Sequence, residues 1–444
     1  MQDRARWVEL AGIGVVAALS FAPGMVVTPR ANFDSFSYLG RFSLTGERLP
    51  VVPGLYALLG RDLRLIIVVQ CLLAALCWGA LALEALRAFP RPSCYVAYGA
   101  TLLAMASLYV SQWNVALLSD SLSLSLLVLL LSLLSRWVRG AGSLASVVIV
   151  ALLWALTRNT NGYLIVLVGV GSLIAALIWS RRPSYLIASV LGIAAGGFAI
   201  WSSGRGGLWL QPFDHIMAER ILTDPAKVSW FKAHGMPVTP LLLHQAGTYS
   251  FPIDTALRRA PGLASWRAWV TRAGERTYLL YAVEHPLWAL QGTFGRHAEF
   301  STTLAAGSSP SVQQWAWRLS YYGGPVRSLL PGPLHGLFLW ERQATLLVGT
   351  VGTGAVLVWC RHTLRARGAQ LMLWLVVIAL GWLTLVIDWV GDSWELPRHS
   401  VGGTVQIWLG LAFACAALGA SRTDGRPPDD GAGTEALVEA AAHR

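Results

Sequence analysis

The chain has 444 residues, of which 55% are hydrophobic and 13% are charged. A water-soluble domain carries about 25% charged residues, so this composition excludes an ordinary soluble enzyme and indicates a protein embedded in lipid. The net charge is +11, but the arginines lie between hydrophobic segments instead of along one stripe, which argues against nucleic acid as a partner. The five cysteines lie in or beside apolar segments, so we expect neither a disulfide framework nor a cysteine metal site.

Hydrophobic segments of the length that crosses a bilayer, about 20 residues, recur along the chain. The fold class expected is an all-α membrane protein with about ten membrane-spanning helices. The fifth segment is short and leads directly into the sixth, so the two form either separate spans or a broken, re-entrant pair. The expected spans are 8–27, 64–86, 94–110, 120–138, 143–157, 160–179, 184–202, 343–360, 370–387 and 401–420.

Basic residues mark every second connection between the expected spans. Because cytoplasmic loops of membrane proteins are enriched in Lys and Arg, this alternation places both termini and those connections in the cytoplasm. We expect a multi-pass protein of the inner (plasma) membrane, without a cleaved signal peptide. The arginines concerned are Arg4, Arg6, Arg87, Arg91, Arg136, Arg139, Arg181, Arg182, Arg361, Arg365 and Arg367.

The layout divides the chain into four regions, with boundaries at 1–202, 203–342, 343–420 and 421–444. The first region is a transmembrane module whose first outer segment, 28–63, is expected to carry amphipathic surface helices and the catalytic residues. The second is a long extracytoplasmic loop, expected to form short helices on the membrane surface. The third holds the C-terminal spans, and the fourth, rich in Gly, Pro and Asp, is expected to be a disordered cytoplasmic tail.

Asp34 follows the first span, in the stretch Ala31-Asn-Phe-Asp-Ser-Phe-Ser-Tyr-Leu-Gly-Arg41. Asp34, Tyr38 and Arg41 are spaced i, i+4 and i+7, which places them on one face of a helix. A helix lying along the outer membrane surface would present Asp34 to a cavity as a general base, with Tyr38 beside it to contact the substrate. The alternative is that Asp34 caps or solubilises an ordinary loop helix.

Asp120 occupies the outer mouth of the fourth span, in the stretch Leu117-Leu-Ser-Asp-Ser121. The structural interpretation is that Ser119 or Asp120 satisfies free backbone N–H groups as a helix N-cap. The functional interpretation is that Asp120 meets Asp34 at a common outer cavity and takes part in catalysis. The two carboxylates would then share a divalent cation, or one would act as base while the other binds a sugar hydroxyl or a metal.

Charged residues suited to phosphate follow on the same outer side. Arg158 lies where arginine is otherwise depleted, and it either snorkels at the interface or grips a phosphate through its planar guanidinium. The densest charged cluster beside any span, 388–400, contains Glu395, Arg398 and His399. We expect Arg398 and His399 to bind a lipid phosphate and Glu395 to orient Arg398; the alternative is an ordinary solvated loop.

Together these motifs resemble those of the GT-C class of polytopic glycosyltransferases, which includes protein O-mannosyltransferases, aminoarabinose transferases and mycobacterial arabinosyltransferases. The stretch 33–38 is similar to the acid-and-tyrosine motif of the first outer loop in that class, and 117–121 is similar to the acidic motif of the second. The resemblance implies a GT-C-like fold, a polyprenyl-phosphate-linked sugar as donor and often inversion at the anomeric carbon. Many members carry two adjacent acids in the first motif, whereas Ser35 follows Asp34 here. A single base remains sufficient for the reaction, and a metal site is not carried over with the motif.

The activity expected is transfer of a sugar from polyprenyl phosphate to a hydroxyl of a cell-envelope glycan, lipid or protein, with Asp34 as general base. No P-loop and no strand-flanked glycine-rich motif is present, and a divalent cation is the one cofactor left open. A transporter or flippase of lipid-linked sugars would carry ionisable groups deep within spans, whereas Glu84 lies close to a cytoplasmic end. A non-catalytic envelope assembly protein would need no convergence of Asp34, Asp120 and Arg398.

Overall fold

The computed structural model describes residues 2–26, 35–40, 43–44, 48–180, 183–207, 209–248, 255–294, 342–363, 368–391 and 399–423. The described residues form helices joined by turns and contain no strand. Three predicted site residues, Asp34, Glu395 and Arg398, lie outside the described part of the chain, as does 424–444 of the expected tail.

The long helices coincide with the expected spans. Six of those described, α4, α7, α9, α10, α22 and α24, are long and apolar enough to cross a bilayer, so the chain is a helical membrane protein. Helices α5, α8 and the Val348–Val358 part of α21 are apolar but shorter. The bounds are α1 (Gln2–Val26), α4 (Leu63–Ala88), α5 (Cys94–Ala106), α7 (Asp120–Val138), α8 (Leu144–Ala155), α9 (Asn159–Ala175), α10 (Pro183–Gly206), α21 (Arg342–Thr363), α22 (Gly368–Gly391) and α24 (Val401–Thr423).

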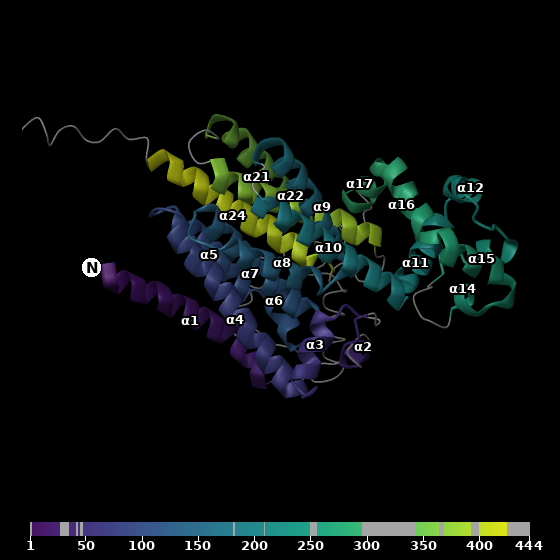
Figure 1. Cartoon of the computed structure of the whole chain (residues 1–444), viewed down its shortest axis with the longest axis horizontal. Helices are drawn as coiled ribbons and strands as arrows, with labels where there is room; N and C mark the ends of the chain where they lie inside the picture. The colour runs from purple at the N-terminus through teal and green to yellow at the C-terminus, as the bar shows by residue number, and fades with distance from the viewer. Residues whose placement is uncertain are drawn as a thin grey trace, which may run out of the picture.

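The long helices pack as one bundle, in which α9 lies against α10, α22 against α24, and α4 against α1, α5 and α7 (Figure 1). Glycines allow the closest of these contacts. A Cβ added to Gly381 of α22 would lie 2.8 Å from the carbonyl oxygen of Gly403 in α24, and one added to Gly196 of α10 would lie 2.5 Å from that of Gly162 in α9. Small residues of this kind let membrane helices approach closely, so α22 packs tightly on α24 and α10 on α9.

Short helices cover one end of the bundle. Helices α2 (Ser35–Leu39) and α3 (Val51–Leu58) lie beside the start of α4, and α6 (Leu108–Ser111) leads through a 3₁₀ turn (Gln112–Val115) toward α7. Asp62 caps α4, because its Oδ1 accepts hydrogen bonds from the backbone N–H groups of Arg64 and Leu65. Helix α2 is a single turn, shorter than the helix through Arg41 that the sequence spacing suggested.

The region after α10 forms a helical unit with its own core, beyond the same end of the bundle (Figure 1). Its helices are α11 (Leu210–Ile216), α12 (Pro225–Ala233), α13 (Pro240–Leu243), α14 (Ala256–Arg259), α15 (Ala264–Trp269), α16 (Glu275–Glu284) and α17 (Pro286–Phe294). The core is aromatic, with Phe213, Phe231, Trp266 and Trp269 buried together. Of the short surface helices expected over 203–342, those described between Leu210 and Phe294 pack on one another, in addition to contacting the bundle.

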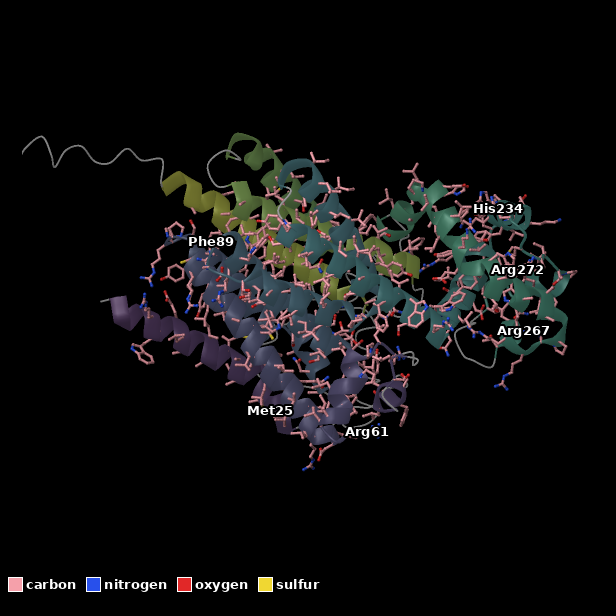
Figure 2. All side chains as sticks on the ribbon, viewed as in Figure 1. Met25, Arg61, Phe89, His234, Arg267 and Arg272 are labelled. Carbon is pink, nitrogen blue, oxygen red and sulfur yellow. The ribbon has the colours of Figure 1, made fainter. Side chains whose placement is uncertain are left out.

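The unit is attached to the end of α22. Arg220 donates a hydrogen bond to the carbonyl oxygen of Trp389 at 2.6 Å, and its guanidinium lies 4.2 Å from the centre of that indole ring. Tyr278 donates to the carbonyl oxygen of Val390 at 2.8 Å. The last carbonyls of a helix have no partner within the helix, so these bonds stabilise the terminus of α22 and hold it in place. Figure 2 shows His234, Arg267 and Arg272 on this unit and Phe89 at the opposite end of the bundle.

Candidate functional site

Polar side chains from four parts of the bundle meet at one cavity, at the end covered by α2 and α3. Asp120 comes from α7, Arg158 from the turn between α8 and α9, Asp388 from α22, and His399 lies two residues before α24. The cavity measures about 20 Å³, which is room for a water molecule and not for a sugar. Substrate binding would therefore require the covering segments to move.

Asp120 and Arg158 form an ion pair, with Arg158 Nη1 2.9 Å from Asp120 Oδ1. The Asp120 side chain is 1% exposed and that of Arg158 is 13% exposed. Asp120 is the first residue of α7, where the helix dipole favours a negative charge. The other guanidinium nitrogens of Arg158 make no hydrogen bond to the described residues, although the side chain lines the cavity. Arg158 therefore neutralises Asp120 while keeping donors for a second anion.

Asn161 fixes the turn that carries Arg158. Its amide nitrogen donates to Ser123 Oγ of α7 at 2.9 Å, to Thr157 Oγ1 at 2.9 Å and to the carbonyl oxygen of Trp154 at 3.0 Å. These contacts join α7, the end of α8 and the start of α9. The turn is short, because α8 ends at Ala155 and α9 begins at Asn159.

Asp388 is the second buried acid of the cavity. It is 2% exposed and lies in the last turn of α22, where the helix dipole disfavours a negative charge. Thr160 Oγ1 of α9 donates a 3.0 Å hydrogen bond to Asp388 Oδ1. One turn earlier, Thr384 Oγ1 donates to Gln406 Oε1 of α24 at 3.3 Å, and both residues line the same cavity. Buried acids that line a cavity are concentrated at functional sites.

Helix α2 packs directly over Asp120. Tyr38 is 5% exposed and donates to Ser119 Oγ at 3.0 Å, one residue before Asp120. Tyr56 of α3 donates to the carbonyl oxygen of Leu118 at 3.0 Å and accepts from Gln70 Nε2 at the same distance. Burial raises the pKa of Tyr56, so its hydroxyl keeps its proton and acts as a donor here. The first outer segment is thus anchored on the stretch around Asp120, and Asp34 directly precedes the first residue of α2.

The predicted site residues divide into two groups. Tyr38, Asp120, Arg158 and His399 lie at this end of the bundle, with the last three lining the cavity. Asp34, Glu395 and Arg398 are outside the described residues, so their placement stays a prediction. Among the residues that are described, no group of three or more His, Cys, Asp or Glu side chains has the arrangement of a metal site. The divalent cation therefore stays an open expectation.

Sequence reasoning missed the parts of the site that lie inside apolar helices. Asp388 was seen as one member of a charged cluster, without a role of its own, and Thr160, Thr384 and Gln406 were not singled out. The signal that could have found them was the presence of polar residues near the end of an otherwise apolar span, at a spacing that places them on one helix face. Thr384 and Asp388 are four residues apart and therefore share one face of α22.

Comparisons of the chain with protein-family models, with curated proteins and with solved structures give no match. The likeness to the GT-C class therefore depends on the motifs of the first two outer segments.

Proposed function

We propose that the chain is a membrane glycosyltransferase of GT-C type, with about ten spans, that uses a polyprenyl-phosphate-linked sugar at the extracytoplasmic face of the inner membrane. The observation that carries the proposal is the meeting of Asp120, Arg158, Asp388 and His399 from separate helices at one cavity. Two buried acids beside a guanidinium with spare donors suit a substrate that combines hydroxyl groups with a phosphate.

In the proposed reaction, the oxygen of an acceptor hydroxyl attacks the anomeric carbon of the donor sugar. The bond from that carbon to the phosphate oxygen breaks, the electron pair leaves with polyprenyl phosphate, and Asp34 takes the proton of the attacking hydroxyl. A base within hydrogen-bond reach contributes roughly 10²–10⁴-fold to such a step. The products are the glycosylated acceptor, with an inverted anomeric carbon, and polyprenyl phosphate.

The roles of the other residues follow from their charges and positions. Arg158, with His399 and Arg398, stabilises the charge that develops on the departing phosphate, because donors aimed at growing charge act most strongly in a dry site. Asp120 keeps Arg158 in place through the 2.9 Å contact. Asp388 accepts hydrogen bonds from sugar hydroxyls, as it does from Thr160 in this conformation. Tyr38 couples the segment that carries Asp34 to the rim of the cavity.

The positions of the buried charges favour an enzyme over a transporter. Asp120 begins α7, Asp388 lies three residues before the end of α22, and Glu84 lies four residues before the end of α4. These buried charges of the described bundle lie at helix ends, whereas a transport pathway needs ionisable groups near the middle of the bilayer.

The test is the lipid extract of cells that lack the protein, measured by mass spectrometry. The proposal predicts accumulation of a polyprenyl-phosphate-linked sugar, which would also name the donor. The wild-type gene should restore the normal lipid profile, whereas Arg158→Gln should not, provided that the variant reaches the membrane in normal amounts. An unchanged lipid profile in the deletion strain would contradict the proposal.

A further inference from the structure

A second cavity lies at the end of the bundle opposite to the candidate site. It measures about 320 Å³ and is lined where four helices end or begin, by residues of α4, α7, α22 and α24 and of the positions that follow α4 and α7. Its walls are mostly apolar, with Phe89 and Ala417 among them, and its polar lining comes from Arg139 and Gln370. Ala369, one of the lining residues, is exposed.

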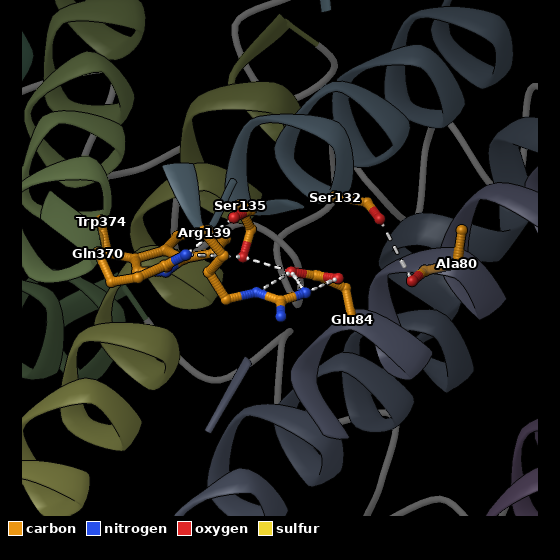
Figure 3. Close-up of polar contacts among 7 residues, drawn as sticks. All are labelled: Ala80, Glu84, Ser132, Ser135, Arg139, Gln370 and Trp374. Atoms are coloured by element: carbon orange, nitrogen blue, oxygen red, sulfur yellow. Dashed lines mark hydrogen bonds and ion pairs between the residues drawn. The ribbon is translucent and has the colours of Figure 1, made fainter. Parts of the chain in front are cut away.

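Arg139 is held rigidly at this cavity by a buried carboxylate. Its Nε lies 3.0 Å from Glu84 Oε1, and its Nη2 lies 2.7 Å and 2.8 Å from the two carboxylate oxygens (Figure 3). Glu84 is 1% exposed and also accepts from Ser135 Oγ at 2.8 Å. Glu84 does not line the cavity, whereas Arg139 does. A ligand in the cavity therefore meets the guanidinium and not the carboxylate behind it.

One edge of that guanidinium is left for a ligand. The contacts to Glu84 use Nε and Nη2, and Nη1 makes no hydrogen bond within the described part of the chain. Figure 3 shows this third nitrogen pointing away from Glu84. The Arg139 side chain is 24% exposed, so the free edge is accessible while the stem is packed. A guanidinium fixed in this way loses little conformational entropy when an anion binds.

The first turn of α22 adds a second favourable element. Ala369 and Gln370 line the cavity, and α22 begins at Gly368, so the positive end of its dipole lies at the same place. The Gln370 amide is occupied, because Nε2 donates to the carbonyl oxygen of Ser135 at 2.8 Å and Oε1 accepts from Trp374 Nε1 at 3.3 Å. Gln370 thus fixes the wall, and Arg139 with the α22 terminus supplies the attraction for an anion.

We propose that this cavity binds the phosphate-bearing headgroup of an anionic membrane lipid, with the lipid's first methylene groups against the apolar wall. Clusters of basic residues between membrane helices bind acidic lipid headgroups at the cytoplasmic side. The exposed Arg87, which directly precedes the lining residue Ala88, matches that setting. The apolar wall favours a lipid over free phosphate, because a small hydrated anion would leave that surface wet. This lipid-site proposal does not depend on the glycosyltransferase activity proposed for the other end of the bundle.

The experiment is native mass spectrometry of the delipidated full chain in detergent, titrated separately with phosphatidylglycerol, phosphatidylcholine and inorganic phosphate. Two variants test the cavity: Arg139→Gln removes the charge, and Ala369→Phe places a bulky ring in the lining while leaving the Glu84–Arg139 pair intact. Arg136→Gln, an exposed arginine that does not line the cavity, is the matched control. Thermal unfolding of each variant verifies that it is folded.

We expect saturable binding of phosphatidylglycerol that is about tenfold weaker in both cavity variants, the loss expected for one charged hydrogen bond. The control should change by less than about twofold, as for an exposed surface charge. Equal binding of phosphatidylcholine would overturn the proposal, as would undiminished binding by folded Ala369→Phe. Inorganic phosphate binding as tightly as the lipid would overturn the assignment of a lipid.

Discussion

Replacing Arg158 by glutamine would leave the Asp120 carboxylate, which is 1% exposed, without the guanidinium that lies 2.9 Å from it. At an effective dielectric constant near 20, two charges about 4 Å apart attract each other by about 4 kcal/mol. Removing one member of a buried pair costs about 3–5 kcal/mol, because the other charge stays away from water. Since Arg158 is 13% exposed, we expect the lower end, a decrease of about 3 kcal/mol in the free energy of unfolding.

A double-mutant cycle separates this pair from the general effect of each substitution. Asp120→Asn alone should cost about 2 kcal/mol, less than Arg158→Gln because the arginine is able to turn toward water. The double variant should cost about as much as Arg158→Gln alone, which gives a coupling energy of about 2 kcal/mol. The assay is reversible unfolding in mixed micelles, followed by tryptophan fluorescence.

The control for the cycle is a pair at the opposite end of the bundle. Arg91 and Glu9 are also in contact, but the Arg91 side chain is 49% exposed, so their coupling should be below about 1 kcal/mol. A coupling energy below about 0.5 kcal/mol for Asp120 and Arg158 would refute the view that they form a buried, energetically linked pair.

Three further predictions concern the segments that surround the site. Tyr38→Phe removes the hydrogen bond to Ser119, so amide hydrogen exchange in α2 should become faster by about fivefold, which corresponds to about 1 kcal/mol. Gly292→Ala would drive its methyl group into the Trp389 ring and should lower the free energy of unfolding by about 2 kcal/mol, measured in the same micelles. Burial raises the pKa of Asp214 to about 6, so the folded state favours the protonated acid, and the thermal midpoint should rise as the pH falls from 7 to 5.

Each of these predictions has a matched control or a contradicting result. Gly197→Ala meets open space in α10 and should leave stability nearly unchanged, which separates the clash with Trp389 from a general effect of alanine. The pH effect should disappear in Asp214→Asn; its persistence would show that another group titrates. Unchanged hydrogen exchange in Tyr38→Phe would mean that the bond to Ser119 does not hold α2 in place.

The sequence was sufficient to locate the long helices, because a run of about 20 apolar residues has few structural alternatives in a membrane protein. It also indicated Asp120 and Arg158, since a charge beside a span is conspicuous against an apolar background. That these two form a pair was not predicted, because Asp120 was expected to meet Asp34. The pairing depends on the turn fixed by Asn161, whose contacts to Ser123 and Trp154 are visible only in three dimensions.

Other contacts depend on packing between distant parts of the chain. Thr160 and Asp388 are 228 residues apart, and their hydrogen bond follows from how α9 lies against α22. The aromatic core around Phe213 and Trp266 is built from short helices, each too brief to show a periodic apolar face. Such contacts are set by the shape of the whole assembly, so local pattern and propensity do not specify them.

The central claim, that a carboxylate of the first outer segment activates an acceptor for attack on a lipid-linked sugar, is tested most directly by transfer assays on purified protein. The donor is the lipid that accumulates in cells lacking the protein, and transfer is followed by the release of polyprenyl phosphate. Asp62→Asn is the control from the same segment, because asparagine preserves the cap of α4. Asp34→Asn should lower the rate by about 10²–10⁴-fold while Asp62→Asn retains it; full transfer by a folded Asp34→Asn variant would contradict the account.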